Sequence, residues 1–114
     1  MPFINSKISV KITKEQEVTI KTKLGEAIAL IPGKSESWLM LGFEEGYHLY
    51  FKGIQHEKIA FVEVKIFGKA DSSAYDKLTQ AICTIYEEEL GIPKDKIYVT
   101  YQEISNWGYN GRNF

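Results

Sequence analysis

Proline is the second residue of the chain, directly behind Met1, and it is the residue best placed to do chemistry. While Met1 is attached, the Pro2 nitrogen is a tertiary amide without basicity. Methionine aminopeptidases remove an initiator methionine when the next side chain is small, and proline meets that condition. We therefore expect Pro2 to become the mature N-terminus, with a secondary amine able to accept a proton near neutral pH. From these two residues alone, the stiff first residue of an edge strand is the other interpretation.

The other reactive residue types form no recognisable site in the sequence. His48 and His56 have no carboxylate cluster beside them, so we expect loop histidines and no metal site. Cys83 is the only cysteine, which excludes an intrachain disulfide, and its apolar helical neighbours predict a core position. The acidic residues 87–89 predict a solvated helix end. The tail around residues 107–111 is no phosphate loop, because no helix start follows it.

The bulk composition predicts one globular domain spanning residues 1–114. With 44% hydrophobic and 25% charged residues the chain is neither disordered nor fibrous, and it is too short for a second domain. A formal net charge of −1 supplies no field to attract nucleic acid or an anionic membrane. We see no membrane span and no signal peptide, and therefore expect a cytoplasmic protein.

Hydrophobic periodicity predicts the same β-α-β pattern twice, followed by a short tail. Alternating apolar residues predict strands, and a period of three to four residues predicts helices with one buried stripe each. Thr13 and Gln16 form a capping-box pattern for the first helix. The predicted strands cover residues 2–10, 37–43, 58–67 and 96–104, with a short extended piece at 47–51; the helices run from Thr13 to Pro32-Gly33 and from near Ser72 to Gly91.

Two such units predict a two-layer α/β sandwich with a four-stranded mixed sheet and both helices on one face. The strands within each unit run parallel because the β-α-β crossover is right-handed. The opposite face would carry Met40, Phe61 and Tyr98, which are too apolar for open contact with water. We therefore expect the bare sheet faces to meet in a homo-oligomer.

Five short motifs, in order and at the right spacing, resemble the tautomerase superfamily, in particular the group of macrophage migration inhibitory factor (MIF) and D-dopachrome tautomerase. They are the opening "MP", Gly33-Lys34, "IFGK" at 66–69, "LGIP" followed by "IYV" at 90–99, and the ending "WGYNGRNF". The resemblance covers essentially the whole chain. It implies a homotrimer with three active sites at subunit interfaces. It also implies cofactor-free keto–enol tautomerisation of α-keto acids such as phenylpyruvate, with Pro2 as the base.

The resemblance assigns roles to further residues. Lys34 would hold the substrate carboxylate, although a solvated lysine near a helix end is the other interpretation. Phe67 would offer its backbone amide to the same carboxylate, and Lys65, where relatives have histidine, would be a second cation or mere surface charge. Apolar neighbours and lysines would lower the pKa of the Pro2 amine. The aromatic walls would come from Trp38, Tyr98, Trp107, Tyr109 and Phe114.

The chain departs from the family pattern at several positions. Trp107 stands where relatives often have a smaller aliphatic residue, and Tyr109 where they have tryptophan, so the ring pocket should be reshaped. Thr100 replaces an asparagine that, in the mammalian proteins, reaches the substrate from the adjacent subunit, which puts a preference for hydroxylated rings in doubt. The mammalian Cys-x-x-Cys pair is absent, so thiol-oxidoreductase activity does not carry over.

Two alternatives to the enzyme remain open from the sequence. One is a cytokine-like protein that engages a host receptor, and since such relatives leave cells without a signal peptide, export also stays open. The other is a small ligand-binding α/β domain whose resemblance is accidental. Dehalogenation and decarboxylation rank low, because these reactions use extra arginines or acids and Arg112 is the only arginine.

Overall fold

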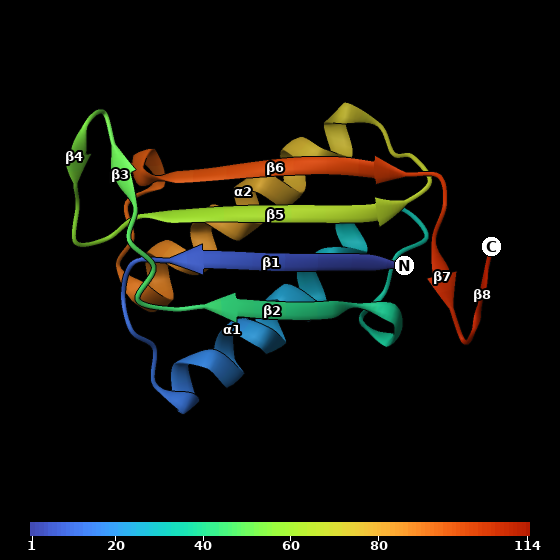
Figure 1. Ribbon diagram of the computed structural model, residues 1–114, viewed down its shortest axis with the longest axis horizontal. Helices are drawn as coiled ribbons and strands as arrows, with labels where there is room; N and C mark the ends of the chain where they lie inside the picture. Colours follow the sequence, from blue (N-terminus) through green and yellow to red (C-terminus); the bar gives the residue numbers. More distant parts are fainter.

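The computed structural model describes residues 1–114 as a four-stranded sheet with both α-helices packed on one face (Figure 1). The strand order is β2-β1-β5-β6. β1 is parallel to β2, β5 is parallel to β6, and the two central strands β1 and β5 are antiparallel. The bounds are β1 (Pro2–Ile8), β2 (Met40–Glu44), β5 (Ala60–Phe67) and β6 (Ile97–Ile104). This confirms the predicted two-layer fold with a mixed sheet.

The helix ends follow local capping chemistry. α1 (Lys14–Ala27) begins with the predicted capping box, in which Thr13 Oγ1 accepts from the Gln16 amide and Gln16 Oε1 accepts from the Thr13 amide. The α-helix ends at Ala27 and continues as a 3-10 turn (Ile28–Leu30), so the predicted end at Pro32-Gly33 was too late. α2 (Ser72–Leu90) stops at Gly91, whose φ of 69° lies in the left-handed region that glycine tolerates.

One apolar core lies between the sheet and the helices. Every second residue of β1 and β5 is buried, as period-two strands require. Ser6 is the only buried polar side chain in this core, and it accepts a hydrogen bond of 2.5 Å from the Tyr86 hydroxyl on α2. The largest fully buried apolar side chains are Ile4, Ile8, Ile20, Leu24, Ile28, Ile31, Ile66, Leu78, Ile82 and Ile92.

Several smaller elements differ from the sequence-based expectation. The predicted strand 37–43 begins only at Met40, because residues Glu36–Trp38 form a 3-10 turn. Of the predicted extended piece at 47–51, only Tyr50 and Phe51 form a strand, and this strand belongs to a hairpin that projects beyond the end of the sheet (Figure 1). The C-terminal tail also folds into a hairpin, and the two hairpins are β3 (Tyr50–Phe51) with β4 (Ile54–Gln55) and β7 (Gly108–Tyr109) with β8 (Arg112–Asn113).

The sheet face opposite the helices carries both apolar and charged side chains. Met40 is 68% exposed and Tyr98 is 58% exposed. Lys7, in the same row as Phe61 and Tyr98, forms an ion pair of 3.0 Å with Glu63 across β1 and β5. Neither helix combines the length and apolar character needed to cross a membrane.

Candidate active site

Pro2 is buried at the first position of the central strand β1, opposite Ile66 of β5. The first residue of a strand is a position where the missing amide hydrogen of proline costs no ladder bond. Since β1 has a neighbour on both sides, the edge-strand interpretation of Pro2 does not hold. The ladder extends one residue further, because the Phe67 amide donates to the Met1 carbonyl at 3.0 Å. The chain start is therefore held in the sheet.

Lys34 reaches the same end of β5 from the turn that follows the first helical segment. Its Nζ donates to the Phe67 carbonyl at 2.8 Å, and its side chain is half-buried. Burial lowers the pKa of the Met1 amino group below its ordinary value, and the charge and hydrogen bond of Lys34 lower it further. An amine at this end of the sheet is therefore biased toward its neutral form, the form that can act as a base.

An aromatic cavity of about 340 Å³ opens beside Pro2. Trp38, in the turn before β2, packs edge-on against Tyr109 of the C-terminal hairpin, with the ring centres 5.3 Å apart. Phe114 lies 6.3 Å from Tyr109 and 5.7 Å from Phe67, measured between ring centres. Figure 1 shows this hairpin at the end of the sheet where the N-terminus lies. The cavity is lined by Met1, Pro2, Phe3, Ser37, Trp38, Leu39, Met40, Trp107, Gly108 and Tyr109.

The structure brings most of the predicted site residues to this end of the sheet. These residues are linked by hydrogen bonds, by ring contacts or because they line the same cavity. Together with Pro2 they are Lys34, Phe67, Trp38, Trp107, Tyr109 and Phe114. Lys65 lies on β5 one position before Ile66, the residue opposite Pro2. It is opposite Phe3 and Gln102, and its side chain is half-buried. It does not line the cavity, and it forms no ion pair.

Tyr98 and Thr100 are not brought to the cavity within one chain. Tyr98 pairs with Phe61, whose partner on β1 is Lys7, whereas Pro2 pairs with Ile66. Five residues of strand separate these positions, which is about 16 Å at ~3.3 Å per residue. Thr100 is opposite Glu63 and lies about 10 Å short of the Pro2 row by the same measure. Residues 98 and 100 can therefore serve a Pro2 site only from another copy of the chain.

Two contributions were missed by reasoning from the sequence. The Met1 carbonyl was not expected to pair with the Phe67 amide, and no sequence pattern signals that the sheet continues past Pro2. Phe3 and Met40 line the cavity side by side, since they are register partners in the parallel pair β1 and β2. Their apolar character was visible, but their shared row required the register.

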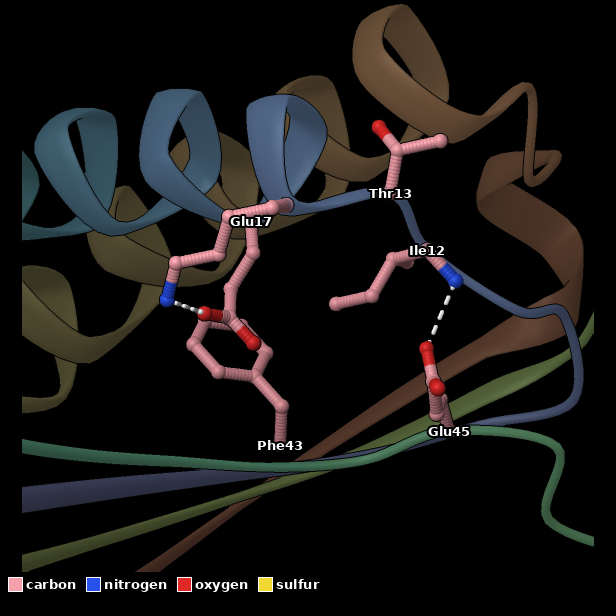
Figure 2. A pocket seen from close by; sticks show the side chains of 6 residues that line it. Ile12, Thr13, Glu17, Phe43 and Glu45 are labelled. Atoms are coloured by element: carbon pink, nitrogen blue, oxygen red, sulfur yellow. Dashed lines mark hydrogen bonds and ion pairs between the residues drawn. The ribbon is translucent and has the colours of Figure 1, made fainter.

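A second hollow offers no free carboxylate for such chemistry. Figure 2 shows one of about 320 Å³ between the start of α1 and the end of β2. Its two carboxylates are already engaged, because Glu17 pairs with Lys14 at 2.9 Å and Glu45 accepts from the Ile12 amide at 2.7 Å. The bond from Ile12 to Glu45 joins the segment before α1 to the residue that follows β2, and the Lys14–Glu17 pair lies within the first turn of the helix.

The two histidines lie closer together than the sequence suggested. His48 and His56 line one surface hollow with Ser9, Tyr47, Gln55 and Glu57. No group of three or more histidine, cysteine or acidic side chains in the chain is arranged to hold a metal ion. Cys83 is buried on α2 as predicted, and burial raises the pKa of its thiol.

Comparison with known proteins places this geometry among relatives. The sequence model of the family described as macrophage migration inhibitory factor (MIF) matches residues 1–114. The chain is 25% identical to the MIF-like protein mif-2 of Caenorhabditis elegans, covering 97% of this chain and 92% of that protein.

Solved structures are similar over almost the whole chain. Leishmania major MIF2 superposes with a TM-score of 0.92 at 29% identity, covering 100% of this chain and 97% of that chain. A macrophage migration inhibitory factor homologue from Prochlorococcus marinus gives a TM-score of 0.81 at 31% identity, with 98% of both chains covered. The family likeness therefore extends from the chain start to the tail hairpin.

Proposed function

The chain belongs to the macrophage migration inhibitory factor family, and from that premise we propose that it is a cofactor-independent keto–enol tautomerase of phenylpyruvate-like α-keto acids. The observation that carries this proposal is the placement of Pro2. Pro2 begins a central strand and is buried beside an aromatic cavity. Its partner Ile66 directly precedes Phe67, whose amide bonds to Met1 and whose carbonyl bonds to Lys34.

The proposed base is the Pro2 nitrogen after removal of Met1. It takes a proton from the carbon beside the substrate carbonyl, the electrons of that C–H bond form the C=C bond, and the carbonyl oxygen takes a proton from water as the enol forms. In the reverse direction the enol hydroxyl gives its proton back to water, and the Pro2 ammonium group returns a proton to carbon. Burial and Lys34 lower the pKa of the Met1 amino group, and the same causes acting on the Pro2 amine would favour the free base near neutral pH.

Lys34 and the Phe67 amide are the proposed anchors of the substrate carboxylate. Lys34 is fixed by its bond to the Phe67 carbonyl, so its ammonium is positioned before substrate arrives. The aryl ring would occupy the cavity between Trp38, Trp107 and Tyr109, whose rings offer it an apolar surface. Lys65, on the neighbouring row of β5, is the weaker candidate for a second cation.

We further propose that the active assembly is a homotrimer with its sites at subunit interfaces. This arrangement would cover the exposed apolar side chains of Met40 and Tyr98. It would also bring Tyr98 and Thr100 of one copy to the Pro2 cavity of the next, which the register forbids within one chain.

Enol turnover by chains that differ only at the N-terminus tests the proposal. The native chain, with loss of Met1 checked by intact mass, should convert enol-phenylpyruvate to the keto form in a spectrophotometric assay. A chain extended by one uncleavable residue before Pro2 should lose at least ~100-fold of this activity, because general-base catalysis contributes about that much.

A matched control separates loss of the base from misfolding. Pro32→Gly changes an exposed proline in the turn before Lys34 and leaves the Pro2 nitrogen untouched, so its activity should stay within about threefold of the native value. Normal turnover by the extended chain would refute Pro2 as the base.

A further inference from the structure

Met1 lies at the end of the proposed site, where it bonds to the Phe67 amide and lines the cavity. Its carbonyl accepts the Phe67 amide at 3.0 Å, while the Phe67 carbonyl accepts Lys34 Nζ at 2.8 Å. Both backbone polar groups of Phe67 are therefore engaged, one by Met1 and one by Lys34. Met1 is half-buried and lines the aromatic cavity, whereas Lys34 does not line it.

Removal of Met1 would change more than the Pro2 nitrogen. The Phe67 amide would lose its acceptor, and a partly buried amide hydrogen without a partner binds an incoming acceptor strongly. Lys34 stands close to the place that Met1 leaves, because Lys34 Nζ contacts the carbonyl and Met1 the amide of the same residue, Phe67. An amide donor, an ammonium group and a newly formed amine would then face one small volume, which is a receptor for a carboxylate.

We propose that Met1, while attached, is an internal occupant of the carboxylate subsite, so that its excision opens the binding site as well as freeing the base. This inference rests on the proposed function and deepens it. Met1 lines the cavity, and its carbonyl and Lys34 Nζ contact the two backbone polar groups of the same residue, Phe67, so an aryl carboxylate lying in the cavity and aimed at these groups would meet Met1. The unprocessed chain is thus a closed precursor that binds aryl carboxylates more weakly and does not turn over its substrate.

Tethering strengthens this closure. The Met1 carbonyl is covalently attached beside the Phe67 amide, so it competes at an effective concentration in the millimolar range or above. A free carboxylate at lower concentration cannot displace it. We therefore expect cinnamate, a planar aryl carboxylate that cannot tautomerise, to bind at least ~10-fold more weakly to the chain that retains Met1.

The chain supplies its own reporter for this binding. Its two tryptophans, Trp38 and Trp107, both line the cavity, so quenching of intrinsic fluorescence by cinnamate reports on this site. Four proteins are compared: the native sequence and Pro2→Gly, each with Met1 removed and with Met1 retained. The Met1-retaining forms are released from a fusion by a protease that leaves Met1 as the first residue. Neither Pro2→Gly form carries the proline base, so a difference between them isolates Met1.

Amide hydrogen exchange gives a second readout that does not depend on activity. The Phe67 amide should exchange at least ~10-fold faster once Met1 is gone, because its acceptor is lost. The Ser9 amide, bonded to the Ile59 carbonyl at the other end of β1, should exchange equally in all four proteins and serves as the control.

The outcomes separate this inference from the proposed function. Weaker cinnamate binding and slower Phe67 exchange in both Met1-retaining chains support it, even if the processed native chain fails to turn over enol-phenylpyruvate, in which case only the proposed reaction is wrong. Equal cinnamate affinity in retained and processed chains, including no binding by either, overturns it. So does Phe67 exchange that is unaffected by Met1.

Discussion

At the scale of single residues, Lys34 is the cation whose removal should report most directly on substrate binding. It is half-buried, its Nζ is held by the Phe67 carbonyl, and a charge-assisted bond to a carboxylate contributes about 1.5–3 kcal/mol. Lys34→Ala should therefore lower kcat/KM for phenylpyruvate about 10- to 100-fold, measured at a pH where the base is fully unprotonated. Lys77→Ala removes an exposed lysine of α2 and should leave kcat/KM within about twofold. Equal losses in the two variants would contradict the anchoring role.

The pH profile of kcat/KM should also show the effect of Lys34 on the pKa of the base. The base acts only when unprotonated, so activity should fall as pH drops below the pKa of the Pro2 amine. Burial and then Lys34 lower the pKa of the Met1 amino group, and we expect the same two causes to lower the pKa of the Pro2 amine one residue further along, so this acidic limb should lie below the ordinary range of an α-amino group. Lys34→Ala removes a nearby positive charge, which favours the protonated amine and moves the limb to higher pH. The acidic limb should stay at the native pH in the control Lys77→Ala. If it also stays there in Lys34→Ala, Lys34 does not lower the pKa of the base.

Individual site residues were predictable where a motif fixed them and not where pairing fixed them. Pro2, Lys34 and Phe67 stood in short motifs, and the structure gathers them at one end of the sheet. The Met1 carbonyl could not be foreseen, because its partner lies at the far end of another strand and only the antiparallel register joins them. Lys65 illustrates the same limit, since its row on β5 became clear only from its pairing with Phe3.

At the scale of elements, one buried hydrogen bond fastens helix α2 to the central strand β1. The Tyr86 hydroxyl donates to Ser6 Oγ, both side chains are fully buried, and burial raises the pKa of Tyr86 to about 12. Tyr86→Phe leaves the Ser6 hydroxyl without its donor and should cost about 1–3 kcal/mol of unfolding free energy. Urea denaturation at fixed protein concentration measures this cost, and Tyr50→Phe, on a tyrosine that is 68% exposed, should cost close to nothing.

The double variant sharpens this prediction. Ser6→Ala alone should also destabilise, because it leaves the Tyr86 hydroxyl unpaired in the core. Ser6→Ala with Tyr86→Phe removes both polar groups, so its cost should be smaller than the two single costs added together. Strict additivity would mean that the two hydroxyls do not interact.

The elements themselves followed from the sequence wherever the signal was local. Alternation predicted β1 and β5, and the capping box at Thr13 predicted the start of α1. The aromatic Trp38 suggested a strand from residue 37, but Glu36 packs over Gly25 of α1, where a β-carbon would collide with it, and the segment turns instead. The partnership of Ser6 with Tyr86 spans 80 residues of sequence, so no local pattern announces it.

At the scale of the whole molecule, the separation of Tyr98 from Pro2 allows a test of assembly that uses inactive chains. Five strand residues lie between their rows, so the proposed site takes Pro2 from one copy and Tyr98 from its neighbour. Pro2→Gly and Tyr98→Ala chains should each be nearly inactive alone while still trimeric by sedimentation. Unfolded together at equal amounts and refolded, they should form mixed trimers in which some interfaces combine an intact Pro2 with an intact Tyr98.

The expected recovery follows from counting interfaces. If the two chains assort at random around a threefold ring, about a quarter of the interfaces join an intact Pro2 to an intact Tyr98. Activity per site should therefore return to about a quarter of the native value, against near zero for each variant refolded alone. A mixture that stays as inactive as its components would mean that Pro2 and Tyr98 act in the same chain or that Tyr98→Ala inactivates by disturbing the structure. Because the register excludes the first explanation, such a result would remove Tyr98 from the site and leave the interface proposal to Thr100 alone.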